Sequence, residues 1–478
     1  MTPDLIEALG RIVGSRWVRH RRAELTTYAM DGLPTRESYP GVVVVPADAA
    51  EVREVVRLLH LIGVPFVARG AGTGLSGGAV ADPDAVLITL TRMNRILRIE
   101  PGRRRAVLQP GVVNARLSEA AAPHGLQYVP DPSSQTACTV GGNVAENAGG
   151  PHCLKYGVTT NHVTQLEVVL SDASVVRLGS PQGDPWGPDL VGLFVGSEGM
   201  FGIATEITFH IVPHEFISME HVEIPASEFE AHSKQWLDGR TAVFLYLFPY
   251  APGGGRIVAE LRRKAGGGPT DGTHRLALRN FFWREALPEA AHIADRLPIK
   301  QLREHYLDVV QQVVRKFLDH ALDLRRVSPV DQIVNFAEGG KKFGFSMWAF
   351  PAAQFARVLS DYLDFCRRQD YRTRLPHVSY HVAQDRHSLL SYSQDGDVWT
   401  LDPVSTGIEP GWHEFLHVFN DFCSDRAGVP LFNQTPHLER RHVVRAFGER
   451  LERFESARRR FDPTDRMLNE YFAKLLRS

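Results

Sequence analysis

Five glycines fall within the ten residues RGAGTGLSGG at positions 69–78, behind one arginine and with no acidic residue among them. Glycine is the residue of choice where a backbone turns with positive φ or lets a ligand approach closely. Consecutive N–H groups in such a turn also form a concave anion site. A diphosphate ligand and a plain tight turn are therefore the two hypotheses that this segment raises.

Two further segments of similar, glycine-rich composition follow. They are PDPSSQTACTVGGNVAENAGG at 130–150 and VGSEGMFGIATE at 195–206. The first of these is too polar and too flexible for a core element, yet too apolar in its middle for a linker. A single phosphate needs one such segment, so three together indicate one extended ligand bound along backbone amides. For any one of these glycines alone, an ordinary turn is an equally good explanation.

The elements around these segments follow an α+β pattern. Asp48 and Glu51 predict a capped helix that ends at Gly63 and whose apolar face is Val52, Val55, Val56, Leu59 and Ile62. Strands are predicted at 41–46, 65–68, 85–90, 106–112 and 204–212, a helix near 114–122, and a hairpin over 165–178 that turns at 171–174.

A nicotinamide-dependent dehydrogenase is a weaker hypothesis for the first glycine segment. The steady alternation of strands and helices typical of a dinucleotide-binding parallel sheet is missing, and no clear helix follows RGAGTG. Such a fold also needs an acidic residue about 20 positions beyond the glycines, and Asp82 and Asp84 come too soon.

The second half of the chain has a different pattern of predicted elements, with longer helices. Helices are predicted over 275–324, two strands around a turn within 332–351, a strand at 377–383, and two helical regions at 411–426 and 437–460. An amphipathic helix carries Phe355, Val358, Leu359, Tyr362, Leu363 and Cys366 on one face.

The bulk composition excludes several classes of protein. The 478 residues are 43% hydrophobic and 23% charged with a net charge of −1, so nothing global favours a nucleic acid or an anionic membrane. The four cysteines show no CxxC pattern, which predicts reduced thiols in a cytoplasmic protein and no cysteine-bound metal. No stretch of about 18 apolar residues occurs, so we expect no transmembrane segment.

The glycine-rich segments resemble those of a known family. RGAGTGLSGGAV, DPSSQTACTVGGNVAENAGGPHCLKYGVTTNHV and DLVGLFVGSEGMFGIATEIT are similar to the flavin-binding half of the vanillyl-alcohol oxidase superfamily, in particular its glycolate oxidase and D-lactate dehydrogenase branch. The resemblance covers about 37–212. It implies a PCMH-type FAD-binding domain of two α+β subdomains over 1–215, an α+β substrate (cap) domain over 216–425, and a segment at 426–478 that returns to the FAD domain.

The same resemblance implies which residues bind FAD. Those around the pyrophosphate would be Arg69, Gly70, Ala71, Gly72, Thr73, Gly74, Leu75 and Ser76. Those beside the ribityl chain and the flavin ring would be Pro132, Ser133, Thr139, Gly142, Asn143, Asn147 and Gly149. Those near the adenine side would be Gly196, Glu198, Gly202 and Ile203.

We expect the FAD to be held without a covalent bond. Relatives that tether the flavin use a histidine in the first segment or a cysteine in the second, and here the first segment has no histidine. Cys138 is expected to be a small packed residue beside the cofactor, and His152 and Cys153 are expected to be structural.

The resemblance thins in the C-terminal half. The glycolate and lactate branch carries H-x-G-D-G-N-x-H and a later E-H-G, which bind a divalent metal. Here His381 and His387 are six residues apart instead of seven, the core of the motif is missing, and no metal is expected. The segments at 435–439 and 458–472 look more like aldonolactone and alditol oxidases. Asn469 would then approach the flavin, although an ordinary helix-end asparagine is an equally good interpretation.

Oxidation of a carbon that bears a hydroxyl needs a base, a cation and a dry surface over the flavin ring. The candidates are Tyr380, His377, His381, Arg386 and His387, with Arg325, Arg326 and Lys342 as cations. His377 and His381 share one face of the predicted strand, which favours them. The predicted catalytic set is His377, His381, Tyr380 and Arg326.

The sequence therefore predicts an FAD-linked oxidase or dehydrogenase that acts on CH–OH donors by hydride transfer to flavin N5. A 2-hydroxy acid is the favoured substrate, a polyol, sugar or aldonolactone comes second, and a natural-product alcohol third. A flavin-binding subunit without catalysis is the alternative of another class. The expected partners are the small-molecule substrate and O₂ or another electron acceptor, and a homodimer is left open.

Overall fold

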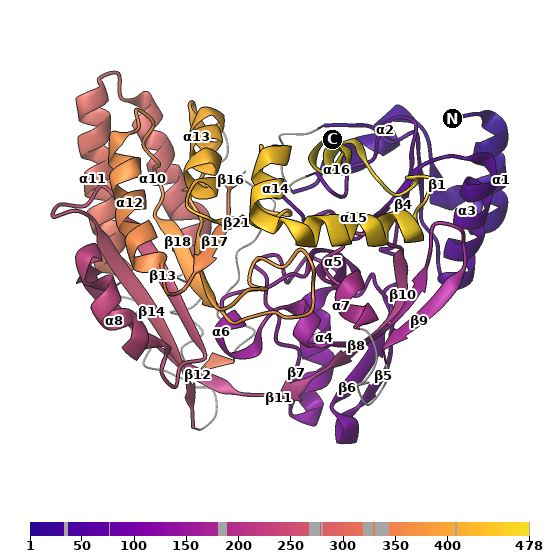
Figure 1. The fold of residues 1–478 in the computed structure, drawn as a ribbon, viewed down its shortest axis with the longest axis horizontal. Coiled ribbons are helices and arrows are strands. Elements are labelled where there is room, and N and C mark those ends of the chain that lie inside the picture. The colour runs from indigo at the N-terminus through magenta and orange to yellow at the C-terminus, as the bar shows by residue number, and fades with distance from the viewer. Residues whose placement is uncertain are drawn as a thin grey trace.

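The computed structural model describes residues 1–32, 37–75, 77–179, 189–266, 278, 281–318, 328–329, 344–406 and 409–477. Two lobes lie side by side, one built from the first 215 residues or so and the other from a large sheet, and the C-terminal helices return over the first lobe (Figure 1). Helices and mostly antiparallel sheets are combined, which confirms the α+β class. No helix among the described residues is both long and apolar enough to cross a membrane.

The first sheet of the first lobe has the strand order β1-β2-β4-β3. Its strands are β1 (Val18–Arg19), β2 (Val42–Val44), β3 (Phe66–Arg69) and β4 (Val86–Thr89), and β2 and β3 run parallel to β4. Helices α1 (Pro3–Val13), α2 (Arg22–Leu25) and α3 (Ala49–Ile62) accompany it.

The predicted capping of α3 is confirmed. The Asp48 side chain accepts a hydrogen bond from the Glu51 amide, and Gly63 ends the helix with a φ of 74°. Val52, Val55, Val56 and Leu59 are fully buried. Ile62 is 50% exposed, because the last residue of the helix lies beyond the edge of the core.

The second sheet has the order β5-β6-β10-β8-β9 and is antiparallel throughout. Its strands are β5 (Ile96–Glu100), β6 (Arg105–Leu108), β8 (Val163–Val169), β9 (Val175–Gly179) and β10 (Ile203–His210). The hairpin of β8 and β9 confirms the predicted turn. Around this sheet lie α4 (Asn114–Ala121), α7 (Leu190–Phe194) and the small pair β7 (Leu126–Gln127) and β11 (Val212–Pro213). Helix α6 (Cys153–Tyr156) instead contacts strands β13 and β18 of the second lobe.

Helices α1, α2, α5, α6 and α7 of this lobe were not predicted. The glycine-rich segment at 130–150 contains α5 (Val140–Glu146), whose Val140, Asn143 and Val144 are buried. The expectation that this segment is too polar for a core element is therefore wrong. A Cβ on Gly141 would lie 2.6 Å from the Pro110 Cβ, so the glycine allows the helix to approach a neighbouring loop.

The second lobe is built on an eight-stranded sheet of order β15-β12-β14-β13-β18-β19-β17-β21. The strands are β12 (Phe216–Pro225), β13 (Ala242–Phe248), β14 (Arg256–Ala265), β15 (Ser328–Pro329), β17 (Trp348–Pro351), β18 (His377–Val382), β19 (Val398–Leu401) and β21 (Val429–Pro430). A separate pair joins β16 (Gly344–Phe345) to β20 (Val404–Ser405).

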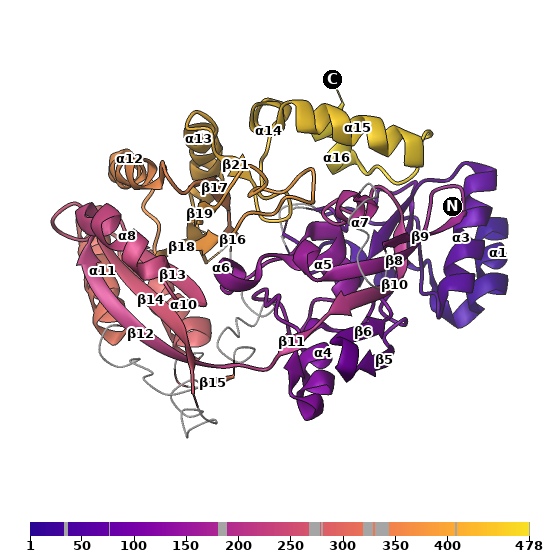
Figure 2. The ribbon, with the colours of Figure 1, turned by 60° about the horizontal axis from the view of Figure 1, so that its bottom comes forward.

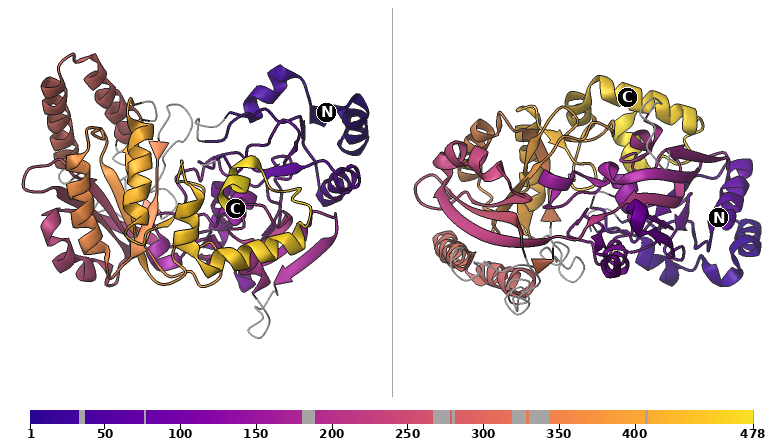
Figure 3. Two further views of the ribbon diagram at one scale, coloured as in Figure 1. Left: turned by 45° about the horizontal axis from the view of Figure 1, so that its top comes forward. Right: turned by 90° about the horizontal axis from the view of Figure 1, so that it is seen from below.

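Helices cover both faces of this large sheet (Figures 2 and 3). One face packs with α8 (Phe229–Leu237), α12 (Phe355–Arg368) and α13 (Trp412–Ser424). The opposite face packs with α10 (Leu287–Ile293) and α11 (Lys300–Lys316). The apolar face predicted for α12 is confirmed, since all six of its residues are buried. Much of the predicted strand pair at 332–351 lies outside the described residues.

The C-terminal helices are α14 (Arg440–Phe447), α15 (Glu449–Phe461) and α16 (Glu470–Leu476). Gly448, with a φ of 48°, divides the single helical region that the sequence predicts over 437–460. Phe454 and Phe461 of α15 lie against Phe201 of the first lobe, with ring centroids 4.8 and 5.5 Å apart. This aromatic contact attaches the end of the chain to the first lobe.

We expect Phe454→Ala to lower the free energy of unfolding by about 3–5 kcal/mol, because the change leaves a cavity under α15. Chemical denaturation of the purified protein measures the effect. Arg453→Ala changes an exposed residue of the same helix and should stay within about 0.5 kcal/mol of the unchanged protein. Equal stabilities of the two variants would contradict the aromatic attachment.

Candidate functional site

One cavity between the two lobes is lined by all three glycine-rich segments. It offers about 250 Å³ in which the centre of a water molecule fits. The predicted FAD-binding residues that line it are Arg69, Gly70, Ala71, Gly72, Thr73, Gly74, Leu75, Pro132, Ser133, Thr139, Gly142, Asn143, Gly149, Glu198, Gly202 and Ile203. Ser76 lies outside the described residues. The structure thus brings the three glycine-rich segments together around one cavity, although they are spread over more than a hundred positions of the sequence.

The first glycine segment leaves β3 and is held in shape by buried side chains. Gly72 and Gly77 have φ values of 72° and 87°, which favour glycine. The Arg69 guanidinium donates to the Ala79 and Met30 carbonyls at 3.0 and 2.8 Å, and Asp31 Oδ2 accepts from the Gly77 amide at 2.6 Å. The Arg69 guanidinium therefore stabilises the loop by donating to backbone carbonyls, and it is not a free cation.

Two glycines of the first segment, Gly70 and Gly74, have no room for a side chain. A Cβ on Gly70 would lie 2.2 Å from Thr139 Oγ1, and a Cβ on Gly74 would lie 2.4 Å from Glu146 Oε1. Thr139 Oγ1 is itself buried and has no hydrogen-bond partner among the described residues. Bare backbone beside an unpartnered hydroxyl fits a ligand that brings diphosphate oxygens and its own polar groups.

The half-buried Glu198 also lies on the wall of this cavity. Burial, with the Glu146 carboxylate adding to it, raises the pKa of Glu198 well above its usual range. Asn433 donates to Glu146 Oε2 at 2.9 Å. A neutral Glu198 can therefore lie near a bound diphosphate without adding a second negative charge.

Three predicted FAD-binding residues lie beside the cavity instead of on its wall. The Asn469 side chain donates to the carbonyls of Gly77, Gly78 and Val80 and accepts from the Phe472 amide. These hydrogen bonds join α16 to the first glycine segment. The prediction that Asn469 approaches the flavin is thus corrected to a supporting role.

Asn147 and Gly196 have supporting positions for similar reasons. The Asn147 amide donates to Asp385 Oδ2 at 2.8 Å, and its oxygen accepts from Thr160. Gly196 donates its amide to the Val144 carbonyl at 2.9 Å, and a Cβ there would lie 2.5 Å from Ser388 Oγ. Both residues fix the end of α5 against the 385–388 loop.

The two favoured catalytic histidines point away from the cavity. His377 Nδ1 contacts the Tyr362 hydroxyl at 2.6 Å, Nε2 contacts the Thr373 hydroxyl, and the residue is fully buried between β18 and α12. His381 packs edge-on against Trp399 on the same face. Burial lowers the pKa of His377 to about 3 and that of His381 to about 4. The prediction that they catalyse the reaction is therefore corrected: they share one face, but that face is the core.

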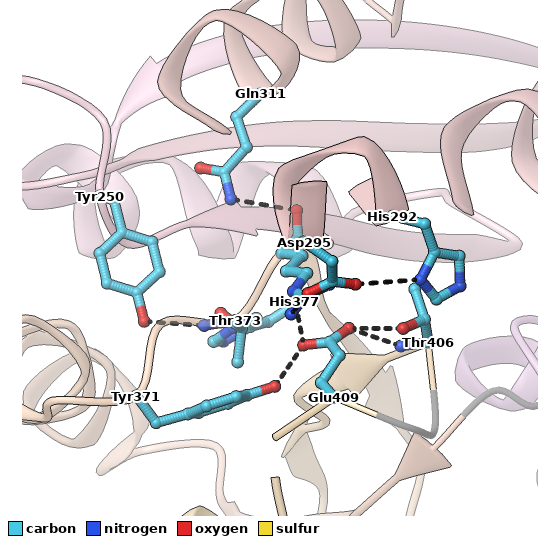
Figure 4. Close-up of polar contacts among 10 residues, drawn as sticks. Tyr250, His292, Asp295, Gln311, Tyr371, Thr373, His377, Thr406 and Glu409 are labelled. Carbon is cyan, nitrogen blue, oxygen red and sulfur yellow. Dashed lines mark hydrogen bonds and ion pairs between the residues drawn. The ribbon is translucent and has the colours of Figure 1, made fainter. Parts of the chain in front are cut away.

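Polar contacts fasten the segment that leads into β18 (Figure 4). The Thr373 backbone amide donates to the Tyr250 hydroxyl at 3.3 Å. The Glu409 carboxylate accepts from Tyr371 and from the Thr406 hydroxyl, the latter at 2.9 Å. Asp295 receives two hydrogen bonds of 2.6 Å from Arg374. These bonds hold β18 in register in the sheet.

The opposite face of β18 faces the cavity. Val378 and Tyr380 line it, with Phe244 stacked on Tyr380 at a ring distance of 6.0 Å and an angle of 3°. Of the predicted catalytic residues that lie within the described part of the chain, Tyr380 is thus the one that the structure places at the cavity. Its hydroxyl donates to Met347 Sδ at 3.0 Å, and burial raises its pKa well above the usual range.

The sequence did not single out Asp402, which also lines the cavity. It follows β19 and is 2% exposed. An acidic residue directly after an apolar strand, in WTLDP, was the available signal, but the same signal marks many turns.

The remaining candidates lie elsewhere. His387 Nδ1 contacts Asp189 Oδ2 at 2.6 Å, and Arg386 donates to Gln384, so neither lines the cavity. Arg325, Arg326 and Lys342 lie outside the described residues. Within the described part of the chain, no group of three or more His, Cys, Asp or Glu residues is arranged to hold a metal ion.

Comparisons with known proteins agree with this geometry. A family model described as "FAD binding domain" matches residues 40–179, and a model described as "D-arabinono-1,4-lactone oxidase" matches residues 207–475, more than half of the chain. The chain belongs to the D-arabinono-1,4-lactone oxidase family. Its cofactor is FAD, and the FAD-binding domain spans the first two glycine-rich segments.

Several curated relatives match less than half of the chain. Glycolate oxidase subunit GlcD of Escherichia coli strain K12 is 47% identical over 210 residues, 44% of this chain and 42% of the relative. D-lactate dehydrogenase of Anaerostipes hadrus is 42% identical over 175 residues, 36% of this chain and 37% of the relative. D-2-hydroxyglutarate dehydrogenase of Stutzerimonas stutzeri is 34% identical over 210 residues, 44% of this chain and 45% of the relative. The chain thus spans less than half the length of these relatives.

Gly70→Ala should weaken FAD binding, because the new methyl group would overlap Thr139 Oγ1. Overpacking of this kind costs about 1–3 kcal/mol, which corresponds to a rise in the Kd for FAD of about 5- to 150-fold. Gly102→Ala is the matched control, since a Cβ there meets nothing within 4 Å. The ratio of flavin to protein absorbance after purification measures the effect, and equal FAD contents in both variants would count against the proposed wall.

The buried His377 predicts a loss of stability in acid. Its folded pKa of about 3 lies below the unfolded value, so the unfolded chain binds more protons between about pH 6.5 and 3 and stability falls as the pH drops through that window. At pH 5 this residue alone costs about 2 kcal/mol. Denaturation at pH 7 and pH 5 should show a smaller difference for His377→Asn than for the unchanged protein. The exposed His305→Asn should keep the full difference, and equal differences in the two variants would refute the assignment.

Proposed function

We propose that the chain is an FAD-dependent oxidoreductase that oxidises the hydroxyl-bearing carbon of a small molecule, a 2-hydroxy acid in the first instance. The observation that carries this proposal is the single cavity enclosed by the three glycine-rich segments on one side and by the large sheet on the other. Relatives matched over part of the chain are named for glycolate, D-lactate and D-2-hydroxyglutarate.

Each wall of the cavity has a different role in this proposal. When bound, FAD supplies the acceptor for a hydride from the substrate carbon. The amides of the segment that begins at Arg69 hold the diphosphate, and Thr139 offers a hydroxyl to the flavin. The aromatic and aliphatic side chains of the large sheet exclude water from the opposite side.

A second candidate is the oxidation of a polyol, sugar or aldonolactone. The match of residues 207–475 to the D-arabinono-1,4-lactone oxidase model favours it, because those residues include the substrate side of the cavity. A natural-product alcohol is a third candidate, and a flavin-binding subunit without catalysis is the alternative of another class.

Reoxidation by O₂ or by another electron carrier, a cytoplasmic location and assembly as a homodimer complete the proposal. The four cysteines are buried and none of them forms a disulfide, which suits a reducing compartment. Non-covalent attachment of FAD also belongs to the proposal, since Cys138 is buried in the wall beside other small residues.

Anaerobic mixing of the FAD-loaded protein with a panel of 2-hydroxy acids, polyols and lactones tests this function. We expect 2-hydroxy acids to bleach the flavin absorbance band, because the hydride passes to the flavin and no O₂ is present to return it. Reduction by lactones or polyols alone would move the assignment to the second candidate. A protein that binds FAD and is reduced by no compound of the panel would support the non-catalytic alternative.

A further inference from the structure

Asp402 is a carboxyl group held in a fixed orientation on the cavity wall of the large sheet. One carboxyl oxygen, Oδ1, accepts from the Ser346 amide at 3.2 Å, and the other, Oδ2, accepts from Gln434 Nε2 at 2.6 Å. Its own backbone pairs with Val378 in an isolated antiparallel bridge, with N–O distances of 3.0 and 2.9 Å. Asp402 is therefore fixed to three parts of the second lobe, and both it and Gln434 line the cavity.

The surroundings of Asp402 on this wall are apolar. Phe244, Tyr246 and Val404 belong to one buried cluster and line the cavity together with Tyr380. The Tyr380 hydroxyl already donates to Met347 Sδ. Within the described residues, no lysine, arginine or histidine of the second lobe lines the cavity. A ligand group that lies here meets aromatic faces and one carboxyl group.

Other ionisable groups do not compete for the same position. His377 and His381 lie on the core side of β18, and the carboxyl groups of Glu146 and Glu198 lie among the glycine-rich segments. Tyr392 also lines the cavity, but burial raises its pKa well above the usual range, which makes it a poor proton acceptor. Asp402 is thus the carboxyl group that the described second lobe presents to the cavity.

We propose that Asp402 is the catalytic base of the oxidation, for a substrate whose hydroxyl-bearing carbon carries an apolar group. This inference rests on the proposed function and names the substrate class and the base for it. The hydroxyl proton of the substrate goes to the Asp402 carboxylate, the C–H pair of electrons leaves as a hydride to the flavin, and the C–O single bond becomes C=O. Gln434 holds the carboxylate toward the substrate through its amide hydrogen bond.

The local electrostatics suit a base that works near neutral pH. Burial raises the pKa of Asp402 to about 8, and the hydrogen bonds from Ser346 and Gln434 offset part of that rise. The titratable group that faces it is Tyr380, which stays neutral in this range. The carboxylate form therefore increases as the pH rises toward about 8, and the rate of flavin reduction should rise with it.

The test compares the FAD-loaded unchanged protein with Asp402→Asn in anaerobic stopped-flow mixing with glycolate, D-lactate, mandelate and 3-phenyllactate. We expect the ring-bearing acids to bind the unchanged protein at least about tenfold more tightly than glycolate. The rate of flavin reduction should fall by about 10²–10⁴ in Asp402→Asn, while the dissociation constant for 3-phenyllactate changes little. Asp395→Asn, an exposed carboxylate in the turn before β19, should behave like the unchanged protein.

A second readout does not depend on activity. Infrared difference spectra of the FAD-loaded protein between pH 6.5 and pH 9.5 should contain the C=O band of a carboxylic acid that loses its proton near pH 8, and Asp402→Asn should lack that band. Its absence from the unchanged protein would overturn the assignment of the base.

The outcomes separate this inference from the proposed function. Reduction of the unchanged protein by ring-bearing acids with an equal rate and pH profile in Asp402→Asn would overturn the role of Asp402 and leave the function intact. Tighter binding and faster reduction with glycolate than with ring-bearing acids would overturn the substrate class. Failure of every compound to reduce the unchanged protein would end both the function and this inference.

Discussion

The architecture of the first lobe depends on keeping bare, glycine-rich backbone in an open shape. A chain of glycines with positive φ has no side chains to hold it, so its conformation must come from neighbours. Arg69 at the start of the loop, with Asp31 and Asn469 near its end, supplies those bonds, mostly to backbone carbonyls and amides. The C-terminal helices matter for this reason: α16 brings Asn469 to the loop, and the Phe454 contact keeps α15 in place over the same lobe.

A second constraint is the distance between the two walls of the cavity. A buried chain of ionisable groups joins the lobes: Asp131 and His152 belong to the first, and Glu260 and Arg262 to the second. Arg262 Nη1 donates to His152 Nε2 at 3.2 Å, which leaves the ring proton on Nδ1, 2.6 Å from Asp131 Oδ2. All four residues are at most 3% exposed. Removal of one partner from such a chain leaves a buried charge without compensation, so the chain fixes the lobes in one orientation.

Local signals explain which features the sequence could predict. The cap at Asp48 and the glycine at position 63 act within a few residues of their helix. The glycine-rich segments are likewise recognisable from their own residues, because repeated glycines indicate backbone that a ligand approaches closely. Helix α5 could not be predicted in the same way, because Gly141 lowers helix propensity and is required only by the approach of Pro110 from another part of the chain.

The substrate side was harder to predict because β18 is buried on both faces. Alternation correctly groups His377 with His381, but it cannot say which face meets the cavity and which meets α12. Two helix layers decide that question, and they come from residues far away in the sequence. Asp402 was missed because its significance comes from Ser346 and Gln434, which the fold brings to it from 56 and 32 positions away.

Hydrogen–deuterium exchange of the protein with and without FAD tests most directly whether three separate segments hold one cofactor. Addition of FAD to the protein freed of flavin should slow exchange together in the amides around Gly70–Gly78, around Thr139–Gly149 and around Glu198–Ile203. The three regions should respond at the same FAD concentration, since they share one ligand. Protection confined to one of the three regions, or saturating at different concentrations, would contradict the account.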